Sequence, residues 1–154
     1  MNTCSEDTRV HSLLPKKTTF YLAADFARQA EMRDVRRRLA ESGYRVTARW
    51  LDVDETPQQD AAMIGGVASA GDHLRLAECA YMDLNDLRAA DVFVQFTTGE
   101  RARGGRHVEL GAALAWHKRV AVVGPLEHVF HYSSAVSVRA ADLDAFLRWA
   151  TRLA

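Results

Sequence analysis

The stretch "DVFVQFTTGERARGGRHVELGAALAWHKRVAVVG", residues 91–124, decides the fold. It begins with the apolar run "DVFVQF", passes through a glycine-containing loop into the helical pattern "RHVELGAALAWHK", and ends on a second apolar run, "RVAVVG". Short apolar runs that do not alternate with polar residues are typical of strands buried on both faces of a parallel sheet. We therefore predict a strand, a helix and a second strand in this order.

The same alternation extends toward the N-terminus. Residues 18–24, "TTFYLAA", predict another buried strand, and residues 25–43 predict a helix that Gly43 ends. Residues 44–51, "YRVTARWL", alternate well enough to predict a second strand. The apolar residues that repeat at helical spacing in the first helix are Phe26, Met32, Val35 and Leu39.

Between these elements and the opening stretch lie a polar segment and a further helix. Residues 52–70 are polar, with Pro57 and a glycine pair, and predict a long loop that holds at most a short helix. Residues 71–90 predict a helix, in which one face carries Leu74, Ala77, Tyr81, Leu84 and Leu87. After residue 124 we expect an irregular segment, a short strand near "VSV" and a final helix over residues 140–154.

Strands that alternate with helices predict an α/β fold. We expect an open, mostly parallel five-stranded sheet of the Rossmann or flavodoxin-like type, with helices on both faces. The chain has 154 residues, 48% hydrophobic and 26% charged, which suits one domain. We place this single domain at residues 17–154, after a flexible tail at residues 1–16.

The composition excludes several classes of function. Twenty basic and twenty acidic residues cancel, so we expect no nucleic-acid partner and no membrane partner. Cys4 and Cys79 form no CxxC pattern, and no apolar run has the length of a leader or membrane span, so we expect a soluble cytoplasmic protein. His107, His128 and His131 lack HxxxH and HExxH spacing, so we expect no metal and no cofactor.

The opening stretch also holds the strongest candidate site. In parallel α/β sheets, ligands bind beyond the C-terminal ends of the strands, which selects residues 21–26, 97–109 and 124–134. Gly104 and Gly105 precede a helix whose first turn is expected to contain Arg106, His107 and Glu109. The backbone N–H groups and dipole of such a helix favour an anion. Arg101, Arg103 and Arg106 add positive charge suited to phosphate.

Each candidate also has a structural interpretation. Glu109 fits an ordinary first-turn helix carboxylate in a solvated basic loop, and the sequence does not decide whether Asp83 or Asp86 faces a pocket. Tyr21 and Trp50 both suit the core, although Tyr21 lies near a strand end and Trp50 could stack on a planar base.

The strings "TTFYLAADF", "DLNDLRAADVFV" and "GGRHVELGAALAWHKRVAVVG" resemble the nucleoside 2-deoxyribosyltransferase superfamily, which includes the 2′-deoxynucleoside 5′-phosphate N-hydrolases. The resemblance spans residues 18–136. It implies that Glu109 is the nucleophile, that Asp83 handles the leaving base and that Tyr21 orients the nucleophile. It also implies a homodimer or higher homo-oligomer with a shared active site.

The chain departs from the transferases of that superfamily in two ways. Arg103 replaces a second acidic residue six positions before the glutamate, and the chain lacks an aromatic C-terminal tail. Arginine in place of an acid favours a nucleotide over a free nucleoside. The N-hydrolases hold the phosphate with a serine of the adjacent subunit, for which His131, Ser133 and Ser134 are the candidates here.

The leading hypothesis is an N-glycosidase that hydrolyses the base–sugar bond of a (2′-deoxy)nucleoside 5′-monophosphate, a small-molecule substrate. The alternatives are a deoxyribosyltransferase that exchanges bases and a non-catalytic nucleotide-binding sensor. The residues expected to bind substrate are Gly104, Gly105, Arg103, Arg106, Asp25, Trp50, His131 and Ser133.

Overall fold

The computed structural model describes residues 17–53, 70–98 and 104–153. The expected flexible tail at residues 1–16 lies outside the described residues. So do most of the expected long loop and two of the arginines expected to bind phosphate, Arg101 and Arg103.

The described chain forms a sheet of five strands in the order β2-β1-β3-β4-β5, and every pairing is parallel. This order is the flavodoxin-like one, so the predicted fold class is confirmed. The strands are β1 (Thr19–Ala23), β2 (Arg45–Val46), β3 (Val92–Phe96), β4 (Arg119–Val123) and β5 (Val136–Ala140).

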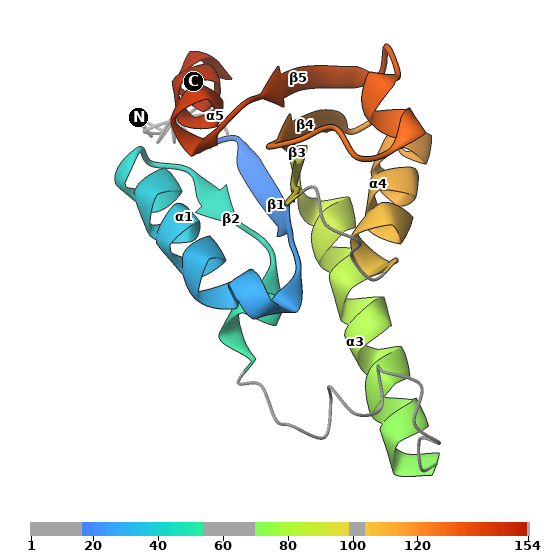
Figure 1. Cartoon of the computed structure of the whole chain (residues 1–154). Coiled ribbons are helices and arrows are strands. Elements are labelled where there is room, and N and C mark those ends of the chain that lie inside the picture. Colours follow the sequence, from blue (N-terminus) through green and yellow to red (C-terminus); the bar gives the residue numbers. More distant parts are fainter. Residues whose placement is uncertain (1–16, 54–69, 99–103, 154) are drawn as a thin grey trace, which may run out of the picture.

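Helices cover both faces of the sheet, as Figure 1 shows. Helices α1 (Gln29–Glu41) and α5 (Leu143–Ala150) lie on one side, where the ion pair between Arg38 and Asp144 links them. Helices α3 (Ala70–Ala89) and α4 (Gly105–Ala115) contact each other on the opposite side.

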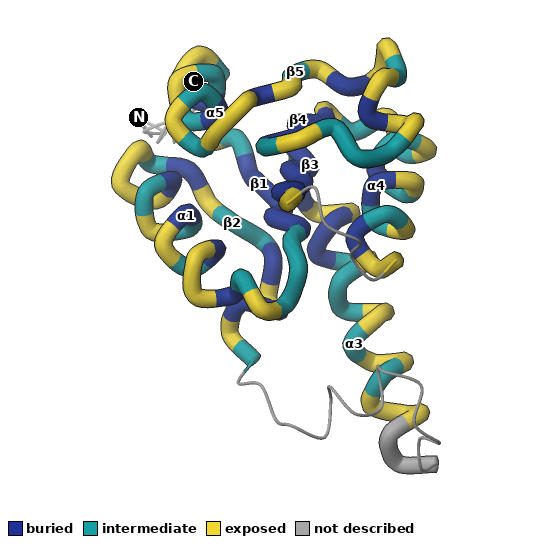
Figure 2. The backbone as a smooth tube through the Cα atoms, in the orientation of Figure 1, coloured by how far each residue is buried: buried dark blue, intermediate teal, exposed yellow. Residues whose placement is uncertain are grey.

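Strand β1 supplies both halves of the core, because neighbouring side chains of a strand point to opposite faces. Phe20 packs edge-on against Phe146 of α5, with ring centroids 6.0 Å apart. Tyr21 points the other way and stacks on Phe93 of β3, with centroids 6.2 Å apart. Strands β1 and β3 are buried along their whole length, which is visible as the dark centre of Figure 2.

The first predicted helix is confirmed, with one refinement. It begins as a short 3-10 turn, η1 (Phe26–Arg28), before α1 continues it. Met32, Val35 and Leu39 are fully buried, and Gly43 has a φ of +83°, the left-handed conformation that ends a helix.

The predicted second strand is wrong over most of its length. Only Arg45 and Val46 pair with β1, and Arg49–Asp52 forms a 3-10 turn, η2. The Thr47 N–H still donates to the Phe20 carbonyl oxygen of β1, at 2.8 Å. The chain leaves the sheet after Thr47, where the Asp86 carboxylate accepts the Arg49 N–H.

Helix α3 confirms the predicted helix but not a buried apolar face. Leu87 is fully buried, whereas Leu74 and Tyr81 are 65% and 72% exposed. In Figure 1 the N-terminal half of α3 extends past the other described helices and strands, so none of them covers it. Among the described residues, none of the helices combines the length and hydropathy needed to cross a bilayer.

Candidate active site

Strand β1 and helix α4 bring together two residues that the sequence singles out. The hydroxyl of Tyr21 donates a hydrogen bond of 2.5 Å to Oε1 of Glu109. Tyr21 lies in the middle of β1 and Glu109 on α4, so the bond joins the sheet to the helix that covers it.

Glu109 is not in the first turn of α4. The helix begins at Gly105, so Glu109 is its fifth residue, and the first turn contains no acidic side chain. The expectation of a first-turn carboxylate is therefore wrong. An exposed first-turn carboxylate is explained by the helix dipole. A partly buried carboxyl that accepts a tyrosine hydroxyl is not explained in that way.

Burial strongly affects the proton affinity of this pair. Loss of hydration raises the pKa of Glu109 to about 8, the Tyr21 hydrogen bond lowers it, and the charge of Asp83 raises it. Burial also raises the pKa of Tyr21 well above its ordinary value, and the charges of Glu109 and Asp83 add to this effect. Tyr21 is therefore a hydrogen-bond donor, and Glu109 can exchange a proton near neutral pH.

Asp83 is the second carboxyl of the site, on the part of α3 that meets the body of the protein. Burial raises its pKa to about 6; the charge of Asp86 adds to the rise, and Arg49 opposes it. Its Oδ1 is buried without a hydrogen-bond partner among the described residues. Since the charge of Asp83 acts on both Tyr21 and Glu109, the three side chains form one electrostatic cluster.

The two glycines before Glu109 border open space. Gly104 is the N-cap residue of α4 and Gly105 its first residue, and both are exposed. A Cβ at either position would meet no atom of the described residues within 4 Å. Packing against the described residues therefore does not require glycine here, and none of them covers this end of α4.

Arg106 is not the exposed, phosphate-binding cation that we expected from the sequence. Its side chain is 2% exposed and forms an ion pair with Glu127, so its charge is already balanced within the protein. Its Nε and Nη1 are buried and have no partner among the described residues. This position argues against Arg106 as the main phosphate ligand and for a role in holding α4 against the segment after β4.

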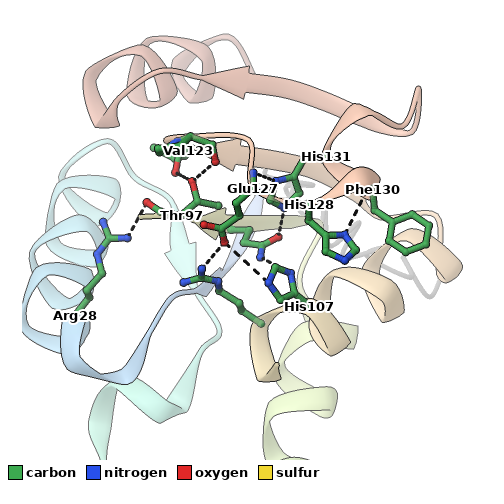
Figure 3. A network of polar contacts seen from close by, with 11 residues as sticks. Arg28, Thr97, His107, Val123, Glu127, His128, Phe130 and His131 are labelled. Atoms are coloured by element: carbon green, nitrogen blue, oxygen red, sulfur yellow. Dashed lines mark hydrogen bonds and ion pairs between the residues drawn. The ribbon is translucent and has the colours of Figure 1, made fainter. Parts of the chain in front are cut away.

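His131 is fully buried in η3 (Val129–Tyr132), and both of its ring nitrogens have protein partners. Its Nδ1 accepts the backbone N–H of Glu127 at 3.2 Å, and its Nε2 lies 3.1 Å from Oε1 of Gln95. Gln95 in turn reaches Nδ1 of His107 at 3.4 Å. Figure 3 shows these contacts between the end of β3, α4 and the segment after β4. His131 therefore anchors that segment, and its ring is not exposed to solvent. Its expected role in binding substrate stays a prediction.

Asp25 and Trp50 lie near the end of β1. The Asp25 carboxylate caps η1 by accepting the Ala27 N–H at 3.0 Å. The Trp50 indole N–H donates to the carbonyl oxygen of Leu22 at 2.8 Å, and the ring packs on Phe26. With 9% of its surface exposed, Trp50 is a core residue, so little of its ring is available to a base.

Ser133 and Ser134 follow η3. The Ser133 hydroxyl oxygen accepts the Ala135 N–H at 3.2 Å and is partly buried, while Ser134 is exposed. Among the described residues, no hydrogen bond joins either serine to Glu109. Their expected role, which needs an adjacent subunit, stays a prediction.

Three further residues near the site were not predicted from the sequence. Gln95 is fully buried and connects His107 with His131. Arg28 of η1 donates to the Thr97 carbonyl oxygen at 3.3 Å and so ties the turn after β1 to the end of β3 (Figure 3). Arg49 binds Asp86 beside Asp83. The sequence could have pointed to Gln95, because it is the one amide side chain in the apolar run "DVFVQF".

Within the described ranges, no cluster of three or more histidine, cysteine, aspartate or glutamate side chains is arranged to hold a metal ion. The site chemistry available to the described residues is that of two carboxyls, a phenol and a helix N-terminus.

Comparison with known proteins gives likeness in structure only. No protein-family model and no curated protein sequence matches the chain. The chain is similar to a CMP N-glycosidase of Clostridium botulinum, with 19% identity, 86% of this chain and 97% of that chain covered, and a TM-score of 0.53. It is also similar to a 2-deoxyribosyltransferase of Bacillus psychrosaccharolyticus, with 17% identity, coverage of 84% and 90%, and a TM-score of 0.57.

A third similar structure is a conserved protein of Enterococcus faecalis, with 12% identity, coverage of 90% and 99%, and a TM-score of 0.58. These likenesses extend over nearly the whole length of each protein, so they concern the complete domain. The chain therefore has the fold that a CMP N-glycosidase and a 2-deoxyribosyltransferase share.

Proposed function

We propose that the chain is an enzyme that cleaves the N-glycosidic bond of a nucleoside 5′-monophosphate, with Glu109 as the nucleophile. The observation that carries the proposal is the hydrogen bond from Tyr21 to Glu109 beside Asp83. The similar structures of an N-glycosidase and a deoxyribosyltransferase support the same class of reaction.

The proposed reaction uses the two carboxyls in complementary roles. Glu109, in its ionised form, attacks C1′ of the sugar; a carboxylate–C1′ bond forms as the bond to the base nitrogen breaks. Asp83, in its protonated form, gives its proton to the departing base. Water then attacks C1′ and gives a proton to Asp83, which releases Glu109 and the sugar 5-phosphate.

Tyr21 prepares Glu109 for this step. Its hydroxyl occupies Oε1, so Oε2 is the oxygen proposed to attack C1′. Because Tyr21 stacks on Phe93 inside the sheet, its donor position is fixed before substrate arrives.

The N-terminus of α4 is the proposed phosphate site. Two observations on the described residues support this assignment: none of them fills the space beside Gly104 and Gly105, and no side chain caps this end of α4. Arg103 lies in the adjacent segment outside the described residues and is proposed as a further ligand. Arg106 contributes less, since it is already paired with Glu127. Asp25, at the end of β1, remains a candidate for binding the sugar.

We further propose that the enzyme works as a homodimer in which Ser133 approaches the phosphate of the neighbouring site. Large apolar side chains that nothing in the described chain covers support an assembly: Leu74 and Tyr81 on α3, and Phe130 and Tyr132 on η3. A cytoplasmic location remains a prediction from the sequence.

Base exchange is the second candidate function, favoured by the likeness to a 2-deoxyribosyltransferase. It shares the covalent intermediate and differs only in the acceptor, which is a second base instead of water. A non-catalytic sensor is the third candidate, and the presence of Tyr21, Asp83 and Glu109 in one cluster argues against it.

The test is incubation of the protein with a panel of ribo- and deoxyribonucleoside monophosphates and the matching nucleosides, followed by chromatography of the free base. We expect release from a monophosphate and none from Glu109→Gln. Release only when an acceptor base is added would favour exchange. Tight binding without release across the panel would favour the sensor, and activity on nucleosides alone would overturn the phosphate assignment.

A further inference from the structure

Two charged residues near Asp83, Asp86 and Arg49, form an ion pair with each other. Asp86 lies three residues after Asp83 on α3, so the two side chains are neighbours on one face of the helix. The Asp86 side chain is 8% exposed, and both of its oxygens accept hydrogen bonds from Arg49. Oδ2 accepts the Arg49 N–H, and Oδ1 accepts Nε, each at 2.8 Å.

The backbone that presents Arg49 is held from several sides. The adjacent Trp50 donates its indole N–H to Leu22 of β1, and the Gln29 amide of α1 donates to the Trp50 carbonyl oxygen at 2.8 Å. Thr47 donates to the Asp86 carbonyl oxygen at 2.8 Å. Arg49 is therefore fixed relative to both the sheet and α3, although 58% of its side chain is exposed.

Asp83 interacts electrostatically with four groups on the elements around it: Asp86 and Arg49 act on its pKa, and its own charge acts on Glu109 and Tyr21. Asp86 lies on the same helix, Arg49 on η2, Glu109 on α4 and Tyr21 on β1. Glu109 and Tyr21 belong to the reacting cluster itself. Asp86 and Arg49 have opposite effects on the pKa of Asp83, since Asp86 raises it and Arg49 lowers it.

We infer that Asp86 and Arg49 are positioning residues for Asp83: Asp86 supplies a fixed negative charge one helical turn away, Arg49 balances it, and together they set the pH at which Asp83 exchanges its proton. The inference rests on the proposed function for its catalytic meaning, because Asp83 acts there as acid and then as base. The electrostatic statement itself needs no substrate.

The test is the titration of the Asp83 carboxyl carbon by NMR in protein labelled with 13C-aspartate, with Asp83→Asn used to assign the resonance. We expect Arg49→Met to raise the midpoint by about half a pH unit, since one nearby positive charge is lost. Arg49→Lys should keep the midpoint near that of the parent protein. Asp86→Asn should lower it, because a negative charge is lost while Arg49 remains.

Arg36→Met is the matched control. Arg36 also pairs with an aspartate of η2, Asp52, at 2.7 Å, but it extends from α1. Its removal changes the net charge equally and should leave the Asp83 midpoint unchanged. Should Asp86→Asn not fold, the two Arg49 variants still carry the test, because most of the Arg49 side chain is exposed.

An Asp83 midpoint that stays the same in Arg49→Met, in folded protein, would overturn the inference. The outcome is independent of activity, so failure of the proposed function leaves this measurement intact. Where base release is observed, the lower-pH break of the kcat/KM profile, which the pKa of Asp83 sets, should move in the same direction as the NMR midpoint. An NMR shift without a matching kinetic shift would show that the pair does not act through Asp83 in the reaction.

Discussion

Tyr21 and Glu109, 88 residues apart in sequence, share a hydrogen bond of 2.5 Å between the centre of the sheet and the helix above it. The donor is a fully buried phenol, and the acceptor is a carboxyl whose pKa burial raises to about 8. The bond favours the ionised form of Glu109, against the effect of burial.

Replacement of this phenol tests its role directly. Tyr21→Phe keeps the ring that stacks on Phe93 and removes only the donor to Glu109. We expect kcat for base release to fall by about 100-fold, with KM little changed, because a preorganised donor is lost without loss of substrate contacts. Steady-state kinetics on the preferred monophosphate measure this effect.

Tyr44→Phe is the control for Tyr21→Phe. The Tyr44 hydroxyl is also buried and donates to the carbonyl oxygen of Ala150, on the face of the sheet away from Glu109. Its loss should reduce stability but not kcat. Equal losses of kcat in the two variants would contradict the role assigned to Tyr21.

The two carboxyls predict a bell-shaped pH dependence. Glu109 must be ionised and Asp83 must be protonated, and the pKa of Asp83 (about 6) lies below that of Glu109 (about 8). We therefore expect kcat/KM to rise with pH up to about 6, to stay nearly level, and to fall above about 8. The product of the two fractions peaks midway, at about pH 7. Asp83→Asn should abolish the alkaline limb, and an unchanged limb in that variant would exclude Asp83 as its source.

Burial of Glu109 also predicts how stability depends on pH. The pKa in the folded state lies above its unfolded value, so the folded protein holds a proton that the unfolded chain releases. This contribution to stability is fully present below the unfolded pKa and is lost as pH rises through about 8. Glu109→Gln cannot lose a proton, so it should be more stable than the parent protein at alkaline pH.

Urea denaturation at several pH values measures this difference. The two proteins should have similar stabilities at acid pH, where Glu109 is protonated, and should separate as pH rises. If the difference in the free energy of unfolding between the two proteins stayed the same from acid to alkaline pH, Glu109 would not be the group that causes the pH dependence.

The buried pair of Arg106 and Glu127 predicts a loss of stability when one partner is removed. Arg106→Met removes the guanidinium that pairs with the largely buried Glu127 carboxylate, and we expect a cost of about 3 kcal/mol. The double variant Arg106→Met, Glu127→Leu should recover most of this loss. Thermal denaturation measures both effects.

Arg37→Met is the control for the Arg106 variant. Arg37 pairs with Asp34 and Glu41 on the exposed side of α1, and 59% of its side chain is exposed. Its removal should leave the denaturation midpoint nearly unchanged. If the denaturation midpoint of Arg106→Met were as little changed as that of Arg37→Met, the structural role of the buried pair would be contradicted.

The sequence predicts the sheet well because the pattern of each buried strand is local. Strands β1, β3 and β4 are continuous apolar runs, and their identity does not depend on distant residues. The strand predicted over residues 44–51 is wrong for the opposite reason, because its end depends on a distant residue. Whether Arg49 continues a strand depends on Asp86, 37 positions away, which takes its N–H.

The candidate site was predicted in part. The residue types and the rule for strand C-termini place Tyr21 and Glu109 on the same edge, and the structure adds the hydrogen bond between them. Burial was not visible in the sequence. Arg106 and His131 resemble surface cations in "GGRHVE" and "VFHY", yet Glu127 and Gln95 bind them in the interior.

The parallel order of the sheet has a consequence for folding. The Asp91 carboxylate accepts both the N–H and the hydroxyl of Thr19, which fixes the start of β1 beside β3 across 72 residues of chain. Closing a loop of this length is a slow step, because the chain entropy is lost before the contacts repay it. Tyr21 meets Glu109 only after that closure, so on refolding base release should return with the final sheet, later than helix formation.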